Sequence, residues 1–109
     1  MSHVTDVLIL TSVVEVDHEV KQFINDWLKT AIDLDGGLGK ICEISGNIKG
    51  GNKSCQARIY GISSGHFIPV LGKFLFHLQS LDWAAPQDIQ VMIKDENEDK
   101  WTLLDLFSE

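Results

Sequence analysis

The chain has 109 residues, of which 44% are hydrophobic and 23% charged, and this balance predicts one folded domain over residues 1–109. The formal net charge is −7, with the acidic excess in residues 1–35 and 82–109 and a basic excess between them. This charge disfavours direct binding of nucleic acid, which needs clustered Lys and Arg, and no apolar run is long enough to span a membrane.

A strand and a helix are predicted from the first third of the chain. Residues 6–14 (DVLILTSVV) are β-branched and apolar on both alternating faces, which predicts a central strand. Asp17 is expected to cap the helix that follows, and Gly36 and Gly37 are expected to end it. Apolar residues at helical spacing predict its buried face: Val20, Phe23, Ile24, Trp27, Leu28 and Ala31.

The next segment, residues 40–63, predicts a β-hairpin whose turn is KGGNK, residues 49–53. Pairing about that turn sets Cys42 near Tyr60 and Cys55 near Gly46. The two cysteines are therefore not expected to face each other, and without an export signal both are expected to be free thiols in the cytoplasm.

A second helix and a second hairpin complete the chain. Pro69 suits the first turn of a helix, and an apolar face follows it from Phe67 to Leu81, with Phe76 off that face. Ile89, Val91 and Ile93 alternate with polar residues along the next strand. Residues 101–103 begin the return strand, which places the acids of residues 96–99 at the turn.

The element order is strand, helix, hairpin, helix, strand, with one further strand. This βαββαβ order predicts an α+β, ferredoxin-like sandwich with an antiparallel sheet in the order 4-1-3-2, both helices on one face, and an extra C-terminal edge strand. The opposite face of the sheet would then be open. Its expected residues have the composition of a protein interface: Leu8 or Ile9, Arg58, Tyr60, Met92 and Trp101.

Motifs for metal binding and catalysis fail on inspection. Asp95, Asn97 and Asp99 have the spacing of three calcium ligands, but Lys100 stands where the loop needs Gly, and Leu106 where it needs Glu. The GGLGK segment, residues 36–40, lacks the other residues of a phosphate loop. The four histidines form no zinc pattern, and SSGH, residues 63–66, is expected to be a loop. We therefore expect no catalytic residue, metal or cofactor.

The remaining signal is acidic charge on a small protein. We expect a non-enzymatic, cytoplasmic protein that binds a basic protein, most simply a bacterial immunity protein or antitoxin that neutralises a toxin such as a nuclease. The expected contact residues are Asp95, Glu96, Glu98, Asp99 and Trp101, with Asp33 and Asp35 as a second acidic patch and Tyr60 and Met92 on the open face.

Two alternatives stay open at this point. One is a phage- or plasmid-encoded inhibitor that mimics nucleic acid with its carboxylates and binds a host nuclease. The other is a regulatory module that forms a homodimer through the open sheet face and binds a small ligand.

Overall fold

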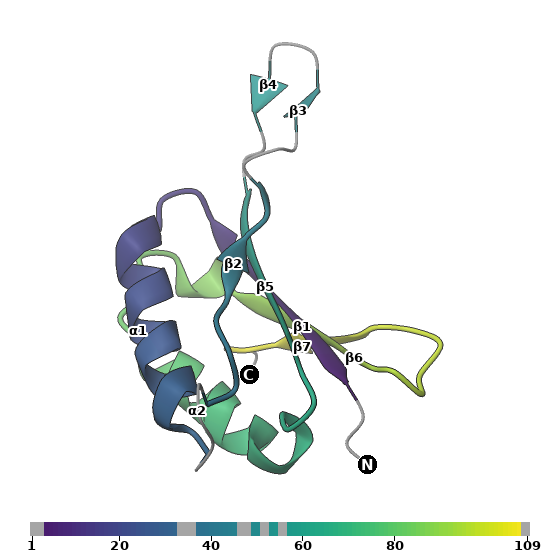
Figure 1. The fold of residues 1–109 in the computed structure, drawn as a ribbon. Helices are drawn as coiled ribbons and strands as arrows, with labels where there is room; N and C mark the ends of the chain where they lie inside the picture. The colour runs from purple at the N-terminus through teal and green to yellow at the C-terminus, as the bar shows by residue number, and fades with distance from the viewer. Residues whose placement is uncertain (1–3, 33–36, 46–48, 51–52, 55–56, 108–109) are drawn as a thin grey trace.

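The computed structural model describes residues 4–32, 37–45, 49–50, 53–54 and 57–107. It is an α+β fold in which two helices cover one face of a five-stranded antiparallel sheet (Figure 1). The strands of this sheet are β1 (Thr5–Ser12), β2 (Cys42–Glu43), β5 (Ala57–Ser64), β6 (Gln90–Asp95) and β7 (Thr102–Asp105). The helices are α1 (Asp17–Thr30) and α2 (Leu71–Ser80).

The sheet order is β2-β5-β1-β6-β7. As expected, β1 is central, since it pairs with both β5 and β6, and β7 adds to β6 at the edge. This strand order differs from the expected order 4-1-3-2. The difference arises because two further strands, β3 (Lys49–Gly50) and β4 (Lys53–Ser54), lie between β2 and β5 in sequence and form a separate two-stranded sheet. In Figure 1 this small hairpin projects away from the main sheet.

The core lies between the sheet and the helices. Val7 and Ile9 of β1 alternate inward with fully buried side chains, as expected for a strand with one face on the core. They meet Ile24 and Leu28 from α1 and Phe74 from α2, all fully buried. The packing predicted for α2 is confirmed, since its apolar face lies in the core and Phe76 is exposed.

Three expectations for α1 are wrong. The helix ends at Thr30, with Ala31 as its C-cap, and not at Gly36 and Gly37. The N-cap position is Val16, which makes no side-chain cap, and Asp17 is the first helical residue. Its carboxylate instead accepts a hydrogen bond from Tyr60, described below. Phe23, placed on the buried face by its spacing, is 52% exposed, because the helix rests on the sheet through Val20, Ile24 and Leu28.

Short 3₁₀ turns flank the second helix. The turn Ile68–Val70 carries Pro69 and leads into α2, in agreement with the expected helix start. A second turn, η3 (Pro86–Asp88), leads into β6. Among the described residues, no helix is both long and apolar enough to cross a bilayer.

Candidate functional site

The open face of the sheet carries an apolar row across three strands. Leu8 of β1 is opposite Met92 of β6, and Met92 is opposite Leu103 of β7, so these side chains point to the same face. Leu8 and Met92 are half-buried, and Leu103 is 54% exposed. The prediction that Met92 lies on the open face is therefore confirmed.

A groove continues this row toward β2. Its centre is Gly61 of β5, which is opposite Leu8 on one side and Cys42 on the other. Because glycine has no side chain, the strand surface is hollow there, and a Cβ at Gly61 would lie 3.2 Å from Leu8 Cδ2. The cavity is about 410 Å³, and Ile44 and Trp101 are among the residues that line it. We call it the Gly61 groove.

Polar and charged side chains complete the Gly61 groove. Asp6, Lys40 and Ser63 lie in its lining, and the Ser63 hydroxyl donates a hydrogen bond to the Asp6 carboxylate. The next hydroxyl along the chain, Ser64 Oγ, accepts the backbone N–H of His66 at 3.4 Å. The expectation that residues 63–66 form a loop is therefore wrong for Ser63 and Ser64, which end β5, and holds for Gly65 and His66, which form the turn after it.

The acidic segment after β6 is a hairpin turn, as predicted, and it extends beyond the sheet (Figure 1). Glu96 holds the N-terminal strand to this hairpin: its backbone N–H donates to the Val4 carbonyl at 2.9 Å, and its carboxylate accepts the Val4 N–H. Glu98 closes the turn, since its carboxylate accepts the Asp95 N–H at 2.9 Å. Two of the predicted contact residues therefore also have a structural role.

The other acids of the hairpin differ in their surroundings. Asp95 accepts a hydrogen bond from the Thr5 hydroxyl at 3.3 Å. Asp99 and Lys100 are exposed at the end of the turn, and Trp101, 39% exposed, follows them. Trp101 also lines the Gly61 groove, so the structure joins the acidic hairpin to the apolar groove through this residue.

Two of the other predicted contact residues, Asp33 and Asp35, are outside the described residues, as is Cys55, which was expected to be a free thiol. The placement of Tyr60 on the open face is wrong: it is fully buried on the helix-covered face, opposite Ile9. The pairing of β5 with β1 fixes this face, because side chains directly opposite each other share a face and Ile9 points into the core. The expected pairing of Cys42 with Tyr60 is also wrong by one residue, since Cys42 pairs with Gly61.

Tyr60 belongs to a polar cluster that the sequence patterns did not predict. Its hydroxyl donates to Asp17 at 2.7 Å, and Arg58 Nη1 lies 3.7 Å from the same carboxylate. Arg58 is thus also on the helix side of the sheet, where its Nη2 donates to the Val13 carbonyl at 3.2 Å. Lys21 forms a further ion pair with Asp17 at 3.1 Å.

The surroundings of this cluster shift two pKa values. Burial raises the pKa of Tyr60, and the hydrogen bond to the Asp17 carboxylate raises it further. Burial opposes ionisation of Asp17, but hydrogen bonds from Tyr60 and Lys21 and the charge of Arg58 outweigh it, so the pKa of Asp17 is below its ordinary value. The cluster therefore fastens the start of α1 to β5 with a charged carboxylate.

Metal ligands and reactive side chains can be sought among the described residues. Among the residues that the structure describes, no three His, Cys, Asp or Glu side chains are grouped so as to hold a metal ion. Tyr60, the residue with the raised pKa, is fully buried and held by Asp17. Trp101 lies between the acidic hairpin, which it follows in sequence, and the Gly61 groove, which it lines.

Comparisons with protein families, curated proteins and solved structures find no match for this chain. The acidic hairpin, the exposed Trp101 and the Gly61 groove are continuous with one another on one side of the molecule.

Proposed function

We propose that this chain is a non-enzymatic protein-binding protein, an inhibitor of the immunity or antitoxin type that neutralises a basic toxin. One observation carries the proposal: Trp101 joins the acidic hairpin to the Gly61 groove. A half-exposed tryptophan beside an apolar groove has the character of an interface hot spot, since Trp is enriched among residues that dominate binding energy.

The acidic hairpin and the Gly61 groove would contribute differently to binding. The hairpin carries Asp95, Glu96, Glu98 and Asp99 against one cation, Lys100, so it would steer a positively charged partner and speed association. The Gly61 groove would take an apolar side chain of that partner and slow dissociation. A nuclease is a suitable partner class because it must be basic to hold its substrate.

The proposal places the protein in the cytoplasm. The exposed Cys42 thiol suits a reducing compartment. We also propose that the fold follows the ferredoxin-like plan. Its support is that β2, β5, β1 and β6 lie in the order 2-3-1-4 when β3 and β4 are treated as an insertion within the first hairpin.

A homodimer through the open face is the second candidate, and the row of Leu8, Met92 and Leu103 favours it. In that case the apolar row would be buried by a second copy of the chain. Size-exclusion chromatography with light scattering separates the two proposals, because only the dimer predicts a particle of twice the chain mass without any partner. A regulatory module of this kind would also be stabilised against heat by a metabolite.

The test of the inhibitor proposal is a capture experiment from lysate of the source cell, using the whole chain as bait at about 50 mM and about 500 mM salt. Mass spectrometry should identify one basic protein that is lost as the salt rises. Trp101→Ala should weaken its binding by about tenfold or more, as expected for a hot spot. Asp99→Asn should slow association about twofold and flatten its salt dependence.

Asp99 is the preferred acid for this test because Glu96 and Glu98 also brace the hairpin. Asp26→Asn on α1 is the matched control, since it removes the same charge from an exposed position on the helix layer. Equal capture by Trp101→Ala and the unaltered chain would exclude the groove as the binding site. Recovery of a host nuclease in place of a cognate toxin would favour the nucleic-acid mimic.

A further inference from the structure

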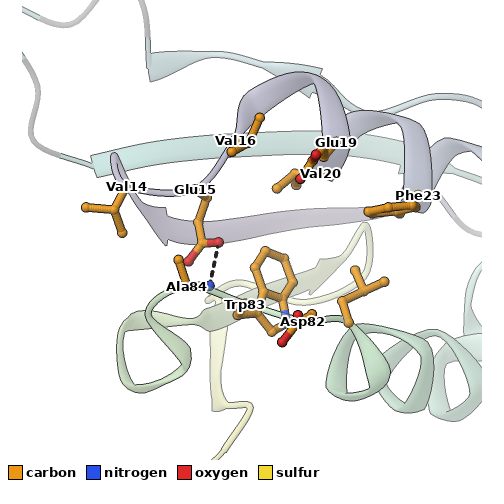
Figure 2. Close-up of a pocket in the computed structure, with 10 residues that line it drawn as sticks. Val14, Glu15, Val16, Glu19, Val20, Phe23, Asp82, Trp83 and Ala84 are labelled. Atoms are coloured by element: carbon orange, nitrogen blue, oxygen red, sulfur yellow. Dashed lines mark hydrogen bonds between the residues drawn. The ribbon is translucent and has the colours of Figure 1, made fainter.

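A second pocket lies at the opposite end of β1 from the acidic hairpin. It is formed by the connection between β1 and α1, the first turns of α1, and residues 81–84 after α2 (Figure 2). Its volume is about 310 Å³. This is at the lower end of small-molecule sites, which span roughly 300–1,000 Å³.

The walls of the pocket are apolar and partly open to water. Its lining includes Val20 and Trp83, which are buried, and Leu81, which is half-buried. Val14, Val16 and Phe23 line it as well, and about half of each of these side chains is exposed. Exposed apolar side chains gathered around a cavity mark a binding site more often than isolated ones do.

The pocket is held in shape by hydrogen bonds across it. One carboxylate oxygen of Glu15 accepts the Ala84 N–H at 2.9 Å, and the other accepts the Ala85 N–H at 2.8 Å (Figure 2 shows the first). Trp83 Nε1 donates to the Leu78 carbonyl at 2.7 Å, which fixes the indole ring as it points toward α1. A ligand would therefore meet walls that are already positioned.

The charge of the lining is entirely negative. Glu15, Glu19 and Asp82 line the pocket, and none of its described lining residues is Lys, Arg or His. Glu15 is 95% buried and makes no ion pair among the described residues, although buried carboxylates are normally paired with a cation. The positive end of the α1 dipole is nearby, but Asp17 and Glu19 in its first turn outweigh its half charge.

We propose that this pocket binds a primary ammonium ion carried on a short apolar body, such as an arylalkylamine. The apolar body would lie against Trp83 and Phe23, where a ring face can also attract the positive charge. The ammonium group would lie between Glu19 and Asp82 and use the acceptor positions that remain on Glu15. A lysine side chain on another protein offers the same chemistry, and the test separates the two sources.

The test is a titration of the ¹⁵N-labelled full chain, followed by NMR, with 2-phenylethylammonium chloride. The Trp83 indole N–H and the Ala84 and Ala85 amides should shift and saturate. 2-Phenylethanol has nearly the same shape without the charge and should bind at least about tenfold more weakly, and 3-phenylpropanoate should not bind. Equal binding of the alcohol and the ammonium ion, or the absence of saturable shifts at these groups, would overturn the proposal.

Variants of the two exposed acids that line the pocket, Glu19 and Asp82, test the role of their charges while the buried Glu15 is kept. The double variant Glu19→Gln, Asp82→Asn should weaken binding of the ammonium ion about tenfold and leave the affinity for the alcohol unchanged. Asp26→Asn, on the same helix but outside the pocket lining, should change neither affinity. If the double variant binds the ammonium ion as tightly as the unaltered chain, the carboxylates do not recognise it and the proposal fails.

The capped peptide acetyl-Val-Lys-Val-amide distinguishes the source of the amine. Tighter binding of this peptide than of 2-phenylethylammonium assigns the pocket to a lysine of a partner protein. Weaker binding assigns it to a free amine. Both results require the same ammonium recognition and support it, whereas failure of both ligands to bind contradicts it.

Discussion

Two neighbouring residues of β5 show how differently the two faces of the sheet are used. Tyr60 points toward the helices, is fully buried, and donates a hydrogen bond to Asp17. Gly61 lies on the opposite face, where the lack of a side chain leaves space for the Gly61 groove. One strand therefore stabilises the fold on one side and borders a groove on the other, because successive residues in a strand alternate between faces.

The same contrast holds along β1. Val7 and Ile9 are fully buried, while Leu8 and Leu10 between and beside them are half-buried on the open face. Both sets are apolar, so hydrophobicity alone does not separate the faces. What separates them is whether helices cover them, which depends on the topology of the whole chain.

The largest expected effect on stability compares Ile9, on the helix-covered face, with its neighbour Leu8, on the open face. Ile9→Ala should lower the free energy of unfolding by roughly 2–5 kcal/mol, because it leaves a cavity in the core. Leu8→Ala removes a similar side chain from the open face and should cost less than about 1.5 kcal/mol. Urea denaturation of both variants measures the difference, and equal losses would mean that the open face is also buried, as in a dimer.

Much of the fold could be predicted from local patterns. The central strand, both helices and the final hairpin follow from alternation and helical spacing, since each pattern depends on neighbours along the chain. The register between β2 and β5 could not, because β3 and β4, which lie between them in sequence, form a separate small sheet. The face of Tyr60 could not either, because it depends on the pairing of β5 with the distant strand β1, in which Tyr60 is opposite the buried Ile9.

An intermediate effect is expected at the polar cluster on the helix-covered face. Tyr60→Phe keeps the ring but removes the hydroxyl that donates to Asp17. Hydrogen bonds to charged groups contribute about 1.5–3 kcal/mol, and we expect about 1–2 kcal/mol here because the Asp17 side chain is 30% exposed. Urea denaturation at neutral pH measures this loss, and a loss below about 0.5 kcal/mol would mean that the cluster does not fasten α1 to β5.

The pH dependence of the stability lost in Tyr60→Phe tests whether the charged Asp17 carboxylate is the group that accepts the hydrogen bond. The pKa of Asp17 is lower in the folded chain than its ordinary value of 3.8, so its stabilising effect is complete above about pH 4 and is lost as the pH falls through the folded pKa. The difference between Tyr60→Phe and the unaltered chain should therefore shrink as the pH falls below about 4. A difference that stays constant to lower pH would indicate a loss of packing and not of the charged hydrogen bond.

The candidate sites were predicted less well than the fold. The acids of the hairpin and Trp101 stand out in sequence as a dense charged turn beside an aromatic residue. The groove does not, because it is made by an absent side chain at Gly61 and by residues from four separate segments. Glu15 was missed as well, although an acid enclosed by three valines in VVEV was a signal of burial.

The smallest effect on stability is expected at the groove itself. Gly61→Ala removes the entropic cost of a strand glycine, about 0.5–1 kcal/mol, but its new Cβ would lie 3.2 Å from Leu8 Cδ2. Because Leu8 borders an open groove, its side chain can move by a few tenths of an ångström, and the two effects should leave the free energy of unfolding within about 1 kcal/mol of the unaltered chain.

Binding, in contrast, should respond to the same methyl group. Gly61→Ala narrows the groove and should weaken capture of the proposed basic partner by about tenfold, since interfaces tolerate poor packing badly at their centre. Gly72→Ala on α2 is the matched control, because nothing lies within 4 Å of its added Cβ and it should stabilise the chain without changing capture. If both variants capture the partner equally, the groove is not where the partner binds, and the contact must rest on the acidic hairpin alone.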